Sequence, residues 1–144
     1  MLGASPVTTD MYLEHLHDAE VTIARLSYGA GPEKILAWYK GSVPDYLKPF
    51  GKLLDGTAAD KKYLSAKEDA PSVADFKLYV FLYKLSVMQK QLGDDSTKAI
   101  LEAPSWIKEY MARIEAIPSI KAFMESPSYM KGPMNNPSAL WRGM

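Results

Sequence analysis

Hydrophobic residues fall on nearly every face of residues 73–92 when this stretch is wound as a helix. A helix that is apolar all round belongs inside a domain, surrounded by other helices. Its start is marked by Ser72 and Asp75, which are placed to form a capping box, with each side chain bonding the other residue's backbone N–H. The pattern therefore predicts a buried central helix that begins at a structural cap made by Ser72 and Asp75 and ends near Gly93.

Apolar residues recur at helical spacing in six further segments. These predicted helices begin at Thr9, Pro32, Val43, Ser96, Pro104 and Pro118. No stretch alternates with the period of two that a half-buried strand requires. The sequence therefore predicts an all-α bundle of five to seven helices over residues 9–126. Residues 1–8 are expected to be a disordered lead-in, and residues 127–144 an extended, proline-interrupted tail.

Composition narrows the possible partners. The 144 residues contain 17 basic and 17 acidic side chains, and this neutral balance argues against nucleic acid or an anionic membrane surface as the main partner. The chain has no cysteine and no apolar run of the roughly 20 residues that span a bilayer. We therefore expect a cytoplasmic protein that makes no use of disulfides or a thiol nucleophile.

The two histidines, His15 and His17, raise the question of a metal site. Residues two apart on a helix point to different faces, and no third ligand stands at a useful spacing. We expect both histidines to be surface side chains and predict no metal. The sequence also lacks a Ser/His/Asp pattern, a phosphate loop and a dinucleotide fingerprint, so the residues alone indicate no catalytic group.

Three ordered segments carry a family resemblance. They are residues 72–76 (SVADF) with Tyr63-Leu64 upstream, residues 43–50 (VPDYLKPF), and residues 112–127 (ARIEAIPSIKAFMESP). Together they resemble the helical C-terminal domain of cytosolic glutathione transferases, especially the pi, mu and sigma classes. The resemblance extends over roughly residues 9–131.

The resemblance implies an activity that this chain would share with a second domain. In the family, a preceding thioredoxin-like domain binds glutathione as co-substrate and supplies the hydroxyl or thiol that stabilises its thiolate. The helical domain adds a wall of the pocket for a small hydrophobic electrophile and part of a homodimer surface, in detoxifying conjugation reactions. The chain begins where that first domain would have ended, so we expect either a fragment or a protein that works without that domain. In both cases we expect the isolated chain not to conjugate glutathione, because the group that stabilises the thiolate is missing.

The resemblance also suggests site residues on the first helix. An ungapped alignment of residues 19–28 with the corresponding family helix puts Asp18 on the acidic residue that reaches toward the partner subunit's glutathione. It puts Ala24 and Tyr28 on positions that face the electrophile. Tyr28 is then a candidate donor to the developing negative charge of the substrate. The plainer interpretations are a helix-end tyrosine that reaches water and a solvated helix-face carboxylate.

Two other functions stay open at this point. Domains of this shape also serve as non-catalytic docking modules, where a helical face meets a protein partner in translation-related assemblies. A chaperone-like or lens-type structural role is a third possibility. A contiguous exposed apolar patch would indicate a missing domain or partner, whereas a polar surface would indicate a chain that stands alone.

Overall fold

The computed structural model describes residues 6–29, 31–55, 61–64, 70–129 and 138–139. Within them the chain forms seven α-helices, which confirms the prediction of an all-α fold. Their bounds are α1 (Pro6–Gly29), α2 (Pro32–Gly41), α3 (Val43–Leu54), α4 (Val73–Leu92), α5 (Asp95–Glu102), α6 (Ser105–Glu115) and α7 (Pro118–Met124). Most of the predicted tail lies outside the described residues.

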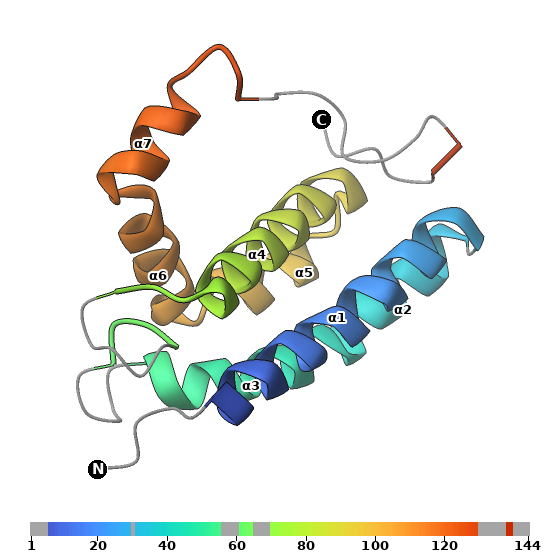
Figure 1. The fold of residues 1–144 in the computed structure, drawn as a ribbon. Helices are drawn as coiled ribbons and strands as arrows, with labels where there is room; N and C mark the ends of the chain where they lie inside the picture. Colours follow the sequence, from blue (N-terminus) through green and yellow to red (C-terminus); the bar gives the residue numbers. More distant parts are fainter. Residues whose placement is uncertain (1–5, 30, 56–60, 65–69, 130–137, 140–144) are drawn as a thin grey trace.

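The helices pack around α4. Helix α1 runs in one direction, α2 and α3 return almost end to end, and α4 then runs alongside α1 (Figure 1). Helices α5 and α6 also contact α4, while α7 continues from α6 and stands away from the bundle (Figure 1). The core between these helices is built mainly from large apolar side chains. Twelve that are essentially inaccessible to solvent are Leu16, Ile35, Tyr39, Val43, Phe50, Leu78, Phe81, Leu82, Leu85, Met88, Tyr110 and Ile114.

Local sequence signals account for most helix ends. Proline occupies one of the first two positions of α2, α3 and α7, where its missing N–H costs nothing. Helix α4 ends at Gly93, whose φ of 64° lies in the left-handed region that glycine adopts without strain. The predicted capping box of Ser72 and Asp75 is present at the start of α4.

Asp75 does more than cap its helix. Its carboxylate is fully buried and accepts four hydrogen bonds. Oδ2 accepts from the backbone N–H and the hydroxyl of Ser72, each at 2.8 Å. Oδ1 accepts from the N–H of Leu64 at 2.7 Å and from the hydroxyl of Tyr110 at 2.9 Å. All four acceptor sites of the carboxylate are thereby used, as a buried charge requires.

Three expectations differ from the structure. Helix α1 begins at Pro6, inside the predicted lead-in and three residues before Thr9; residues 1–5 lie outside the described part of the chain. Asp94, and not Ser96, caps α5, because the Asp94 carboxylate accepts from the N–H of Ser96 and is paired with Lys40. Finally, α4 is not surrounded on every side, since one apolar stripe along it is exposed.

Candidate functional site

The residues predicted to bind the electrophile and glutathione lie on exposed positions of α1. Asp18 and Ala24 are exposed, and 49% of the surface of Tyr28 is accessible to solvent. Ala24 and Tyr28 are four residues apart and therefore share one stripe of the helix. Asp18 is about 120° away from Ala24 around the helix axis, so it faces a different direction. The helix thus brings Ala24 and Tyr28 together but separates Asp18 from them.

Glu20 precedes Ala24 by one turn and ties this stripe to α4. Its carboxylate pairs with Nζ of Lys77 at 2.6 Å and with Nζ of Lys84 at 2.8 Å. Burial raises the pKa of the Glu20 carboxyl, but the bonds and charges of the two lysines outweigh it, and the net pKa is lowered. Glu20 is therefore an ionised clamp that fixes the stripe of Ala24 and Tyr28 beside α4.

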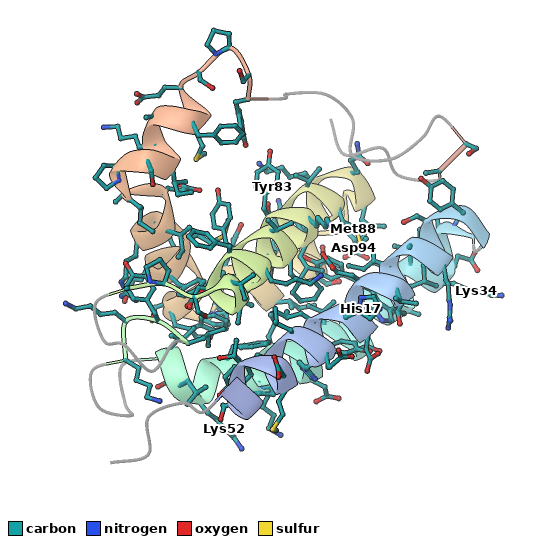
Figure 2. All side chains as sticks on the ribbon, viewed as in Figure 1. His17, Lys34, Lys52, Tyr83, Met88 and Asp94 are labelled. Atoms are coloured by element: carbon teal, nitrogen blue, oxygen red, sulfur yellow. The ribbon has the colours of Figure 1, made fainter. Side chains whose placement is uncertain are left out.

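The α4 apolar face is the exposed stripe formed by Val73, Phe76, Val80 and Tyr83. These residues follow the spacing i, i+3, i+7 and i+10, so they line one side of the helix. Lys77 and Lys84, the partners of Glu20, belong to the same helix and flank this face. Tyr83 marks the open side of α4 in Figure 2. The candidate pocket wall on α1 and the α4 apolar face are thus neighbours joined through Glu20.

A groove of about 320 Å³ continues the α4 apolar face toward α7. Phe76, Val80 and Tyr83 line it from α4, and Ile120 and Phe123 line it from α7. Phe123 has 52% of its surface exposed, a large fraction for a phenylalanine. An apolar surface of this extent resembles a binding surface more than an ordinary part of a solvated domain.

Tyr79 forms the polar edge of this groove. Its hydroxyl donates to Oε1 of Glu115 at 2.8 Å, and its ring stacks on Tyr83 with the centroids 6.5 Å apart. Burial, together with the neighbouring Glu115 carboxylate, raises the pKa of Tyr79 above the ordinary tyrosine value. Tyr79 therefore remains a protonated hydrogen-bond donor at neutral pH and is unsuited to act as a base.

The two histidines lie in different environments. His17 is exposed, but His15 is half-buried and places Nε2 2.9 Å from the carbonyl oxygen of Tyr46. Because a carbonyl only accepts, that nitrogen must donate. The expectation of a surface side chain was therefore wrong for His15, whose ring packs against Tyr46 and Phe50. Among the described residues, no three histidine, cysteine, aspartate or glutamate side chains gather closely enough to hold a metal ion.

The sequence analysis did not identify the ion pairs that Glu20 makes with Lys77 and Lys84. One signal was present, because Glu20 stands one helical turn before Ala24, and Lys77 and Lys84 are two turns apart on the predicted central helix. No local pattern indicates that α1 and α4 are neighbours. Among the described residues, no helix is both long enough and apolar enough to cross a membrane.

Comparisons with known proteins agree with this fold. Residues 17–127 match the family model described as the glutathione S-transferase C-terminal domain. The chain is 29% identical over 139 residues to the glutathione S-transferase class-mu 26 kDa isozyme 51 of Fasciola hepatica, covering 94% of this chain and 57% of the relative. It is 28% identical over 123 residues to glutathione S-transferase P of Bos taurus, covering 85% and 52%. The chain thus spans about half the length of these relatives.

A solved structure supports the same conclusion about the fold. The pi-class glutathione S-transferase of Onchocerca volvulus superimposes with a TM-score of 0.63 at 23% identity. The superposition covers 92% of this chain and 59% of that one. At this identity the likeness establishes the fold alone. Together with the family match over most of the chain, it shows that this protein belongs to the glutathione S-transferase C-terminal domain family.

Proposed function

We propose that this chain forms the helical half of an enzyme that conjugates glutathione to small hydrophobic electrophiles. In this assignment α1 contributes a wall of the electrophile pocket, and the α4 apolar face packs against the part of the enzyme that binds glutathione. The mu-class and P-class relatives support the reaction class, since both are named as glutathione S-transferases. We further expect the assembled enzyme to be a homodimer.

The proposed pocket wall is the stripe of α1 that contains Ala24 and Tyr28. Ala24 has a small side chain that leaves room for an apolar substrate, and Tyr28 brings a hydroxyl group to an exposed position. We assign the Tyr28 hydroxyl to donate a hydrogen bond to negative charge that develops on the electrophile during the attack of the thiolate. Such a bond raises the rate because it is stronger in the transition state than in the ground state.

Asp18 has a separate role in the proposal. Its carboxylate is exposed on a different side of α1 from Ala24 and Tyr28, so it points away from the electrophile wall of its own chain. A carboxylate in that position suits the ammonium group of a glutathione molecule held by the other subunit of a dimer. Charge complementarity between these two groups would contribute to glutathione affinity and leave the chemical step unchanged.

The α4 apolar face is the observation that carries the proposal. Val73 is 62% exposed and Val80 is 43% exposed, and they share a helix face with two aromatic side chains. Exposing such a face to water is unfavourable by about 25 cal/mol per Å² of apolar surface. A covering domain removes this cost, and it would place its own groups beside the stripe of Ala24 and Tyr28, where the reaction requires them.

The test uses the native gene product. Its intact mass in the source cells establishes whether residues precede this segment, and the purified native protein is assayed for conjugation of glutathione to a chloronitrobenzene. We expect activity in a longer native protein and none in the 144-residue chain alone. Efficient conjugation by the 144 residues alone would contradict the proposed division of labour.

Tyr28→Phe tests the assigned role within the native enzyme. We expect kcat to fall about tenfold with little change in KM, because a bond made in the transition state is lost. Tyr12→Phe is the matched control, since it removes a hydroxyl from a half-buried tyrosine of the same helix. Equal kcat values for the two variants would exclude a catalytic contribution from Tyr28.

The alternative is a non-catalytic docking module. The exposed α4 apolar face supports this alternative as well, because the face could bind a partner protein. A native product of the same length as this chain, with no conjugating activity, would favour it. In that case Val80→Asp should release the partner from complexes isolated from the source cells, while Glu109→Gln on the exposed side of α6 should leave them intact.

A further inference from the structure

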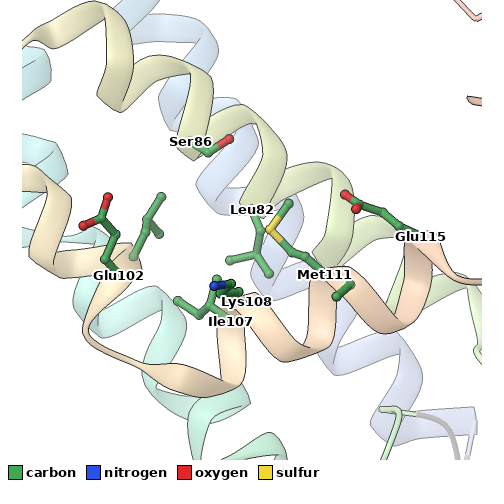
Figure 3. Close-up of a pocket in the computed structure, with 9 residues that line it drawn as sticks. Leu82, Ser86, Glu102, Ile107, Lys108, Met111 and Glu115 are labelled. Atoms are coloured by element: carbon green, nitrogen blue, oxygen red, sulfur yellow. The ribbon is translucent and has the colours of Figure 1, made fainter.

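A second cavity opens between α4, α5 and α6, and it contains neither Ala24 nor Tyr28 (Figure 3). Its volume of about 700 Å³ lies within the range of 300–1,000 Å³ that is typical of small-molecule sites. Leu82 and Ile107 line it and are buried, and the half-buried Met111 lies beside Leu82 (Figure 3). A methionine side chain is flexible and polarisable, so the apolar lining of the cavity can adapt to ligands of different shape.

The acidic groups of the cavity lie at its two ends. Glu102 and Glu115 appear on opposite sides of Leu82 and Met111 (Figure 3). Each is the last residue of its helix, Glu102 of α5 and Glu115 of α6. A helix C-terminus carries partial negative charge from its unpaired carbonyl groups, so a glutamate there adds to a potential that is already negative. Helix α5 has no basic residue in its last turn, and Lys98, one turn before Glu102, pairs mainly with Asp95. Arg113, in the last turn of α6, donates to the carbonyl of Lys62.

The hydrogen-bonding capacity of the polar lining groups also favours a positively charged ligand. Ser86 donates its hydroxyl hydrogen to the carbonyl of Tyr83 at 2.8 Å, which leaves the oxygen as an acceptor. Oε1 of Glu115 accepts from Tyr79, and the second oxygen of the carboxylate can accept from a ligand. Lys108 is the cationic side chain among the lining residues, and it opposes two glutamates. A ligand head that donates hydrogen bonds and carries positive charge therefore complements this cavity.

We propose that the cavity between α4, α5 and α6 binds amphipathic amines, meaning molecules with an apolar chain or ring and a protonated amino group. The apolar part lies on Leu82, Ile107 and Met111, and the ammonium group lies at the end marked by Glu102, since Glu115 already accepts a hydrogen bond. This site does not depend on the proposed conjugation reaction, and binding can be measured on the 144-residue chain.

Three ligands with the same eight-carbon chain separate charge from apolar contact. They are octylammonium, octanol and octanoate, each titrated into ¹⁵N-labelled protein at neutral pH and followed by NMR. Octylammonium should bind about fivefold more tightly than octanoate, with octanol between them, and its largest shifts should fall on Ser86, Met111 and Ala112. The preference should shrink as salt is raised, because the charged groups of the rim are near solvent.

Charge variants at the rim sharpen the test. Glu102→Gln should at least halve the preference for octylammonium over octanoate, and Lys108→Gln should increase it. Glu109→Gln is the matched control, because Glu109 is an exposed glutamate of α6 that does not line the cavity. Ala112→Trp, at an exposed lining position, should block all three ligands without disturbing the core.

Several results would overturn the proposal. Equal affinities for the three ligands would mean that the cavity selects for apolar surface alone. Shifts centred on Phe76 and Phe123 would place binding in the groove between α4 and α7. An unchanged preference in Glu102→Gln would remove the charge argument, and stronger binding of a basic amphipathic peptide than of octylammonium would make this a protein-docking surface.

Discussion

The hydroxyl of Tyr110 in α6 donates a hydrogen bond of 2.9 Å to the carboxylate of Asp75 in α4, and both side chains are buried. The same hydroxyl lies 3.1 Å from the Asp75 carbonyl oxygen. Burial raises the pKa of Tyr110, and the Asp75 charge beside it acts in the same direction, so Tyr110 remains a donor throughout the ordinary pH range. This bond extends the cap of α4 into a connection among α4, α6 and the segment that contains Leu64.

Asp75→Ala should therefore be among the most damaging single substitutions. It leaves the N–H groups of Leu64 and Ser72 without their acceptor, and the hydroxyl of Tyr110 keeps only the main-chain carbonyl of residue 75. We expect a loss of about 4 kcal/mol in the free energy of unfolding, measured by urea denaturation. Asp45→Ala, at an exposed position of α3, is the control and should cost less than about 1 kcal/mol. Equal melting temperatures for the two variants would refute the structural role of Asp75.

Tyr110→Phe should cost much less than Asp75→Ala. The phenylalanine keeps the ring in the core, and the Asp75 carboxylate still accepts from Leu64 and twice from Ser72. Losing one of four bonds to a buried charge should lower the free energy of unfolding by about 1–3 kcal/mol. In the double variant with Asp75→Ala, the effect of Tyr110→Phe should be smaller, because the bond to the carboxylate is already absent and only the contact with the main-chain carbonyl of residue 75 remains. Fully additive losses would show that the two side chains act independently.

The ion pair of Lys40 and Asp94 predicts a specific pH dependence. Nζ of Lys40 lies 2.8 Å from the Asp94 carboxylate, and the lysine, with help from Ser96, lowers the pKa of Asp94 to about 2 from its ordinary 3.8. Because the folded-state pKa is lowered, this stabilisation is complete above the ordinary pKa and is lost as the pH falls from about 4 to about 2.

Lys40→Met removes the main cause of that pKa shift. The difference between its urea midpoint and that of the unmodified protein should be largest above pH 5 and should vanish near pH 2. Added salt should reduce the difference, since the pair is partly exposed. Lys48→Met serves as the control at an exposed lysine of α3. A difference that stays constant with pH would assign the effect of Lys40 to packing of its aliphatic stem.

Gly51 marks a close approach between α3 and α6. A methyl group added there would lie 3.1 Å from Nε1 of Trp106, whereas a methyl group on Gly41 would meet nothing within 4 Å. Alanine in a helix is favoured over glycine by up to about 1 kcal/mol, so Gly41→Ala should be neutral or stabilising. Gly51→Ala should lose this gain to the displacement of the buried Trp106 ring and be less stable than Gly41→Ala by about 1 kcal/mol. The reverse order in thermal denaturation would show that the ring moves freely.

How much could be predicted depended on separation along the chain. The cap of α4 was predictable because Ser72 and Asp75 lie within one helical turn. The bonds to Asp75 from Leu64 and Tyr110 join residues 11 and 35 positions apart, and no local pattern indicates them. The same limit applies to the candidate site. The exposure of Tyr28 was expected from its place near the helix end. The ion pairs of Glu20 with Lys77 and Lys84 join residues far apart along the chain, so they could not be predicted without the fold.

Asp18→Asn provides the sharpest test of the proposed contact with glutathione. The substitution keeps the shape of an exposed side chain and removes its charge, so stability should change by less than about 0.5 kcal/mol. In the native enzyme the KM for glutathione should rise about threefold while kcat stays constant, because a ground-state ion pair near solvent is lost. Asp10→Asn, at another exposed position of α1, is the matched control. If both variants keep the KM of the unmodified enzyme, Asp18 is a solvated carboxylate and the proposed contact across a dimer is wrong. A fall in kcat would also contradict the proposal, because it would mean that Asp18 acts on the chemical step.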